Sequence, residues 1–102
     1  MGAGLRRAVA AAKRTNYPGT PSPQPGQRWV HVADPGSALV VVRIEEATRV
    51  KYVKGRRTQV TITAAVCAVY LDGIDVGRTT SIDVARMVPT SRGYRYVGEG
   101  PP

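Results

Sequence analysis

Few residues in this chain could carry catalytic or metal-binding chemistry. It has one cysteine, Cys67, one histidine, His31, and seven acidic side chains. A single thiol excludes an internal disulfide and any multi-thiolate metal site, and a single histidine lacks the partners of a zinc site or a catalytic triad. Glu45 and Glu46 are adjacent, so a strand would point them to opposite faces. The sequence therefore predicts no enzyme activity, no metal, no cofactor and no small-molecule substrate.

Positive charge is the strongest chemical signal. Fifteen Lys and Arg oppose seven Asp and Glu, which gives a net charge of +8 over 102 residues. Most of these bases are Arg, whose planar guanidinium suits phosphate and carboxylate groups. Residues 1–26 contain no acid and carry the bases Arg6, Arg7, Lys13 and Arg14. The balance predicts a polyanionic partner, although an Arg-rich composition can also reflect a GC-rich genome.

The densest basic stretch lies in the middle of the chain. It holds five bases in nine residues with a tyrosine among them: Arg49, Lys51, Tyr52, Lys54, Arg56 and Arg57. Lys54-Gly55 is a good hairpin turn, so these side chains are expected on one protruding β-ribbon. Such a ribbon can enter a major groove or follow a phosphate backbone, and Tyr beside Arg can stack on a base. The alternative is a solvated hairpin whose charges keep an edge from pairing with other chains.

Aromatic residues offer a weaker candidate. Tyr94 and Tyr96 share one face of the last expected strand, with Arg92 and Arg95 nearby. They could form a stacking platform for single-stranded nucleic acid. We favour a core role, because the chain has no Phe and needs large rings to fill its interior. For the same reason Trp29 is expected to anchor the core.

The chain divides into three parts. Residues 1–26 form a basic, Pro-rich arm and linker, residues 27–98 a β domain, and residues 99–102 a frayed end. Residues 3–14 favour a helix that is too short to be stable alone, and the four prolines of residues 17–26 predict a stiff, extended linker. No stretch approaches the roughly 20 apolar residues that span a membrane. We expect no membrane partner and a location in the cytoplasm or in a particle.

Five alternating stretches predict the strands of the β domain. They span about residues 27–32, 39–46 with a weak continuation to 53, 57–71, 78–86 and 94–97. Turns are expected at Asp34-Pro35-Gly36 and over the segment that the Asp72-Gly73 and Val76-Gly77 pairs bracket. The even-numbered Ala38, Val40, Val42 and Ile44 should share the apolar face. This pattern predicts an all-β fold, a small five-stranded SH3-like barrel with almost no helix; a five-stranded Greek-key barrel is the alternative.

Three short motifs occur in order along residues 25–97. They are Pro25-Gly26-Gln27-Arg28-Trp29, Gly77-Arg78-Thr79-Thr80-Ser81-Ile82 and Thr90-Ser91-Arg92-Gly93-Tyr94. Together they resemble short uncharacterised proteins of actinobacteria and their phages. The resemblance implies an actinobacterial or phage source and a compact domain, and it brings no activity or ligand. The chain departs from that pattern in having only Asp34 where a run of Asp often follows the Trp.

Two functions follow from these observations. The first is a non-catalytic basic module that contacts DNA or RNA phosphates through the 49–57 hairpin and the N-terminal arm, without strong sequence specificity. The alternative is a structural or assembly component, for example of a phage particle, whose arm and barrel dock onto other protein subunits. Salt dependence separates them, because phosphate contacts weaken steeply as salt rises.

Overall fold

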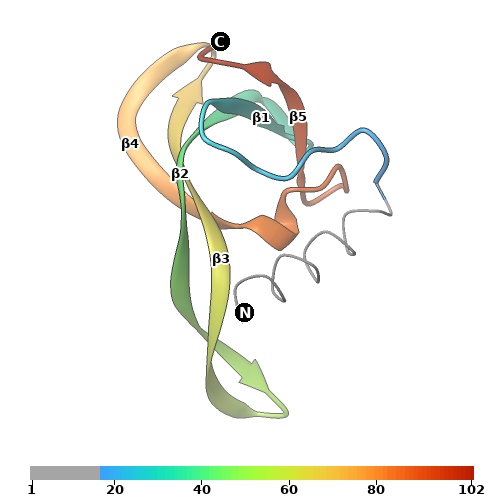
Figure 1. Ribbon diagram of the computed structural model, residues 1–102, viewed down its shortest axis with the longest axis vertical. Helices are drawn as coiled ribbons and strands as arrows, with labels where there is room; N and C mark the ends of the chain where they lie inside the picture. Colours follow the sequence, from blue (N-terminus) through green and yellow to red (C-terminus); the bar gives the residue numbers. More distant parts are fainter. Residues whose placement is uncertain (1–16) are drawn as a thin grey trace.

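A computed structural model describes residues 17–102. They form one antiparallel sheet of five strands in the order β4-β3-β2-β1-β5 (Figure 1). The strands are β1 (Gln27–His31), β2 (Asp34–Val53), β3 (Arg56–Leu71), β4 (Ile74–Asp83) and β5 (Tyr94–Glu99), with a short 3-10 turn, η1 (Val84–Arg86), before β5. The predicted all-β fold is confirmed.

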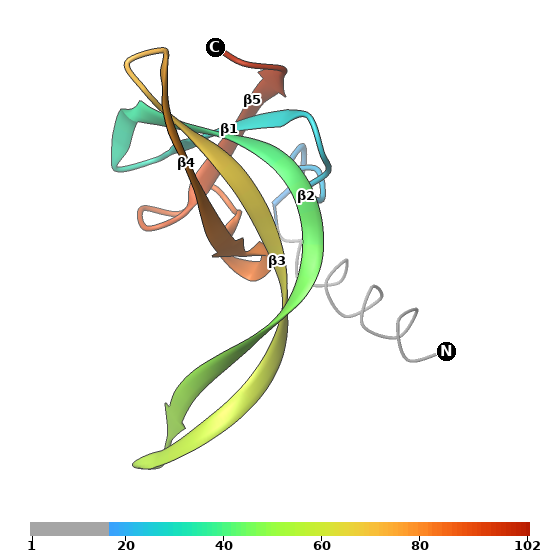
Figure 2. The same cartoon turned by 90° about the vertical axis from the view of Figure 1, so that its left-hand side faces the viewer.

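The sheet curls around its core without closing into a barrel (Figures 1 and 2). Its edges are β4 and β5, which do not pair with each other, so the sheet of the predicted barrel is not closed. Val84 and Met87, on the connection between these two strands, are buried in the core. Side chains rather than a hydrogen-bonded ladder therefore occupy that side. The core consists of Trp29, Leu39, Val41, Ala65, Cys67, Val69, Ile82, Val84, Met87 and Tyr94.

Two of the predicted turns are confirmed. Lys54 and Gly55 have φ angles of 52° and 79°, and Asp72 and Gly73 have φ angles of 51° and 82°. Positive φ at both central residues defines the type I′ turn, whose twist matches that of the flanking strands. These turns connect β2 to β3 and β3 to β4.

The expected turn at residues 34–36 is wrong. The structure turns at residues 32–33 instead, and Asp34 already begins β2. Here the backbone N–H of Ala33 donates to Nδ1 of His31 at 3.1 Å, next to a register shift between Val30 and His31. The imidazole of His31 thus accepts a backbone N–H within the turn that the structure forms.

A β-bulge in β2 reverses the expected face. The pairing with β3 skips Val42, and on its N-terminal side Leu39 and Val41 are buried in place of the predicted Val40 and Val42. Because one extra residue shifts the alternation by one, Ile44 returns to the core face beyond the bulge. Val42 is left half exposed, at 48%.

β4 begins and ends earlier than expected. The strand stops at Asp83 because its carboxylate Oδ1 accepts a hydrogen bond of 3.0 Å from the backbone N–H of Ala85, which caps η1. The expected strand residues Val84 to Arg86 therefore belong to a 3-10 turn. In β3 both faces are covered near Ala65, since Ala64, Ala65, Val66 and Cys67 are all buried.

The segment before β1 lies against the sheet. The N–H of Gly26 donates to the carbonyl of Val41 at 2.8 Å, and the carbonyl of Gly26 accepts from Gly100 at 2.7 Å. Pro23 is buried. Residues 22–26 are thus held by the domain at the point where β1, β2 and the end of β5 meet. Trp29, with no exposed surface, is confirmed as a core anchor.

Candidate functional site

The predicted basic hairpin is a two-stranded ribbon that extends beyond the rest of the sheet. β4 pairs with β3 no further than Ala64, whereas β2 and β3 remain paired from Glu46–Thr63 to Val53–Arg56. We call residues 46–63 the ribbon. At about 3.3 Å per residue it is roughly 25 Å long. Figures 1 and 2 show it projecting away from the core. Within residues 17–102 its two strands pair along the backbone only with each other, and an isolated two-stranded hairpin has marginal stability in water.

The register divides the ribbon side chains between two faces. Directly paired residues share a face, so Tyr52 lies beside Arg57, and Lys51 beside Thr58. The Tyr52 face carries Thr48, Val50, Tyr52, Arg57, Gln59 and Thr61. The Lys51 face carries Arg49, Lys51, Val53, Arg56, Thr58 and Val60. The basic residues of the sequence motif are thus on one ribbon, but only Arg57 shares a face with Tyr52.

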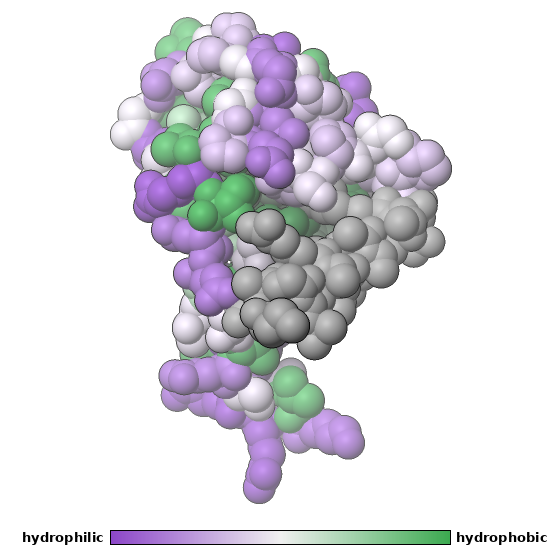
Figure 3. Space-filling view, viewed as in Figure 1, coloured by the Kyte–Doolittle hydropathy of each residue, from purple (hydrophilic) through white to green (hydrophobic). Residues whose placement is uncertain are grey.

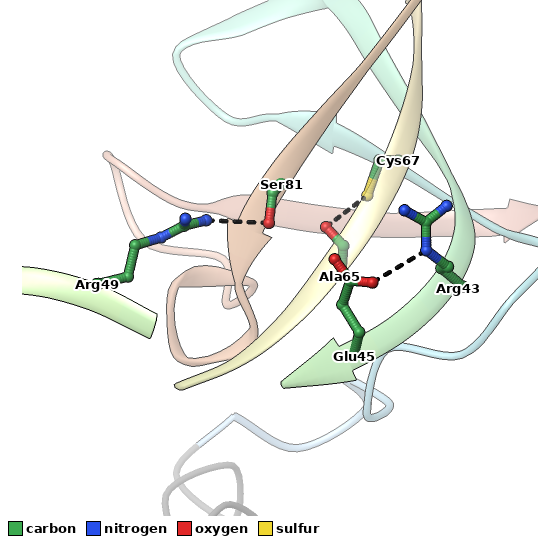
Figure 4. A network of polar contacts seen from close by, with 6 residues as sticks. All are labelled: Arg43, Glu45, Arg49, Ala65, Cys67 and Ser81. Carbon is green, nitrogen blue, oxygen red and sulfur yellow. Dashed lines mark hydrogen bonds and ion pairs between the residues drawn. The ribbon is translucent and has the colours of Figure 1, made fainter. Parts of the chain in front are cut away.

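Four of the five predicted ribbon bases are exposed: Lys51, Lys54, Arg56 and Arg57. None of these four forms an ion pair with any of residues 17–102. The fifth, Arg49, is half-buried, and its Nη2 donates to Oγ of Ser81 on β4 at 3.0 Å (Figure 4). Arg49 therefore fastens the ribbon to the sheet, and the outer part carries unneutralised positive charge.

Apolar side chains share the ribbon with these bases. Tyr52 is 74% exposed, and Val50 and Val53 are each about half exposed. Figure 3 shows hydrophobic and hydrophilic side chains next to each other at the end of the ribbon. A surface depression of about 270 Å³ is lined by Val50, Arg57, Thr58 and Gln59. The exposure of these valines was not predictable from the sequence, because alternating Val in a strand normally indicates a buried face.

The N-terminal part of the predicted site lies outside the described residues. This applies to Arg6, Arg7, Lys13 and Arg14 and to the helix expected over residues 3–14.

The second candidate, the tyrosine platform on β5, is part of the core. Tyr94 is buried with its ring centroid 5.0 Å from that of His31, and Tyr96 packs edge-on against Trp29 at 5.6 Å. The hydroxyl of Tyr96 donates to Oε2 of Glu99 at 2.7 Å, and this hydrogen bond raises the pKa of the phenol. Tyr94 is therefore a core residue, and Tyr96 is partly buried against the core.

Cys67 is a buried, free thiol. Its Sγ lies 3.6 Å from the carbonyl oxygen of Ala65 (Figure 4), and burial raises its pKa from 9.0 to about 11. It therefore remains a neutral thiol at physiological pH. Within residues 17–102, no three His, Cys, Asp or Glu side chains gather as a metal site would require. No helix in that range has the length and apolar character needed to cross a bilayer.

Residues of the three sequence motifs have structural roles in the fold. Gly26 has a φ of 92°, and a Cβ on buried Gly93 would collide with the carbonyl oxygen of Val88. Ile82 and Tyr94 belong to the core. No protein-family model, curated protein or solved structure matches the chain. The motif-based resemblance thus remains a prediction.

Proposed function

We propose that this chain is a non-catalytic assembly module that docks onto other protein subunits through the ribbon. One observation carries the proposal: the ribbon exposes Tyr52, Val50 and Val53 between its bases. A phosphate backbone would account for the Lys and Arg side chains of the ribbon and not for its exposed apolar side chains. A protein surface accounts for both kinds of side chain, because Tyr and Arg are enriched where protein interfaces bury apolar area.

The geometry of the ribbon supports this proposal in a second way. Its bases point in different directions, with Lys51 on one face and Arg57 on the other. A partner that encloses the ribbon would contact both faces and would stabilise a hairpin that the domain itself leaves uncovered. A protein groove can enclose a ribbon in this manner.

Nucleic-acid binding is the second candidate function. The four exposed bases of the ribbon favour it, since no described acid neutralises them. In this case the ribbon would contact phosphates without strong sequence specificity, and Tyr52 beside Arg57 would stack on a base.

An SH3-like fold and an actinobacterial or phage source belong to the same proposal. The order of the strands, with β5 next to β1 and η1 leading into β5, supports an SH3-like half-open barrel. A phage particle of an actinobacterial host, suggested by the three motifs, is the assembly we propose.

The experiment measures the size of the full chain in extract from its native source, before and after nuclease treatment. Docking onto protein subunits predicts a high-mass complex that survives nuclease and remains intact as salt rises from about 50 to 200 mM. Nucleic-acid binding predicts that nuclease, and the same rise in salt, release the chain. A free chain of monomer mass under all conditions would contradict both functions.

The purified chain supplies the matching test of the second candidate. Nucleic-acid binding predicts that mixed DNA or RNA binds at about 50 mM salt and that R56E/R57E abolishes this binding. R92E/R95E serves as the control, because it changes the net charge by the same amount as R56E/R57E at two exposed Arg residues outside the ribbon. No binding at low salt, or equal binding by both variants, would overturn the second candidate.

A further inference from the structure

The hairpin between β3 and β4 exposes a second apolar surface. Leu71 and Ile74 pair directly across this hairpin, and Val76 lies on the same side of β4 as Ile74. All three are exposed, Ile74 at 68%. This hairpin and the ribbon lie at opposite ends of the molecule in both views (Figures 1 and 2). We call residues 71–76 the distal hairpin.

The distal hairpin carries charge of the opposite sign to the ribbon. Asp72 and Asp75 are exposed on it, and the Asp72 carboxylate lies next to Gly36, as does that of Asp34 from β2. The carboxylates of Asp72 and Asp34 thus lie close together at this end, Asp75 follows on β4, and the next basic residue along β4 is Arg78. The molecule has an acidic apolar end and a basic apolar end.

We propose that the ribbon of one copy docks onto the distal hairpin of a second copy. This inference rests on the proposed function, because it names the partner of the ribbon. Tyr52 and Val50 face Leu71 and Ile74 in this arrangement, and Arg57, which shares their face of the ribbon, faces the carboxylates of the distal hairpin. The depression beside Val50 and Arg57 is large enough to take one aliphatic side chain, and Ile74 is the most exposed candidate.

Two physical arguments favour a second copy over nucleic acid as the partner of the ribbon. Opposite potentials on two surfaces steer association and fix its orientation. Both surfaces also have apolar area to bury, which phosphate does not offer. Because the two surfaces differ and lie at opposite ends, the contact is head-to-tail, so copies close into a ring or continue as an open series.

The test uses two variants of the purified full chain, each with one altered end. R56E/R57E reverses charge on the ribbon and leaves the distal hairpin intact. D72N/D75N neutralises the distal hairpin and preserves its turn, since Asn tolerates the positive φ at position 72 and still accepts the N–H of Gly77 at position 75. R92E/R95E, with the same charge change as the ribbon variant, is the control.

Mass measured by light scattering or sedimentation gives the outcome. The wild type and R92E/R95E should self-associate. Each end variant alone should need at least about tenfold higher concentration to associate, because it has lost one interaction of the interface. The decisive result is an equimolar mixture of the two end variants. In that mixture D72N/D75N supplies the intact ribbon and R56E/R57E supplies the intact distal hairpin. The two variants should therefore form a 1:1 dimer and no larger species.

Failure of this inference is distinguishable from failure of the proposed function. A wild type that stays monomeric at about 100 μM, well above the dissociation constants of specific complexes, would overturn self-association. A mixture of the two variants that stays monomeric while the wild type associates would overturn the head-to-tail geometry. In either case a nuclease-resistant complex in native extract would leave docking onto a different protein in place. Association that nuclease treatment of the purified protein removes would show that nucleic acid bridges the copies and would overturn the inference.

Discussion

The indole Nε1 of Trp29 donates a hydrogen bond of 3.1 Å to Oε1 of Gln27, two residues earlier in β1. The same oxygen accepts from the backbone N–H of Gln24 at 2.9 Å, and the Gln27 amide nitrogen donates to the carbonyl of Ser22 at 3.2 Å. Both ends of this buried amide are therefore satisfied. It connects the central ring of the core to the segment before β1.

Gln27→Ala should destabilise the fold by about 1–3 kcal/mol, because it leaves the buried indole N–H without its acceptor. Urea denaturation measures the change. Gln59→Ala, at an exposed position of the ribbon, is the matched control and should have little effect. Equal stability of the two variants would show that the Gln27 amide does not support Trp29.

Gly93→Ala should cost at least about 2 kcal/mol, as overpacking of a closed site does. The new Cβ would collide with the carbonyl oxygen of Val88, which accepts the N–H of Tyr94 at 2.9 Å. Thermal unfolding monitored by circular dichroism measures the loss. Ser91→Ala, at an exposed position in the same loop, should unfold near the wild-type temperature. A Gly93→Ala variant as stable as Ser91→Ala would contradict the packing of this loop.

Stability should fall with pH through the titration of Cys67. Burial raises the pKa of this thiol from 9.0 to about 11, so the fold favours the protonated form. Above pH 9 the unfolded chain releases the proton and the folded chain does not, which favours unfolding. The contribution of the thiol is complete below pH 9 and is lost as the pH rises to about 11.

The measurement is the urea midpoint of the wild type and of Cys67→Ala at pH 8, 9, 10 and 11. Lys and Tyr residues titrate in the same range in both proteins, so the difference between the two curves reports the thiol. We expect the wild type to lose stability relative to Cys67→Ala across this range. Parallel curves would show that Cys67 is open to solvent.

The local signals of the sequence predicted the parts of the fold that depend on few residues. Lys54-Gly55 and Asp72-Gly73 demand tight turns, and the structure forms both. The bulge at Val42 had no such signal, because three consecutive valines fit either face equally well. The turn at residues 32–33 contains a local hydrogen bond from the Ala33 N–H to the His31 imidazole, and Val32-Ala33 carries none of the residues that normally signal a turn.

The candidate site was predictable as a set of residues and not as a surface. Charge density located the ribbon bases, because like charges in a short stretch need no tertiary information. The division of Tyr52 and Lys51 between two faces follows from strand register. The hydrogen bond between Arg49 and Ser81 joins β2 to β4 and forms because the sheet curls, which the sequence pattern did not indicate. The distal hairpin was missed because its exposed Ile74 and Val76 had been expected in a turn.

The central claim is that apolar side chains of the ribbon contact a protein partner. Val53 on the ribbon and Val42 at the bulge are each 48% exposed, so Val53→Ser and Val42→Ser remove the same side chain at equal exposure. The most direct measurement is the fraction of each variant that sediments with the high-mass complex in nuclease-treated native extract. The proposed function predicts a several-fold loss for Val53→Ser and for Tyr52→Ser, and wild-type retention for Val42→Ser. Equal retention of all three variants would contradict it.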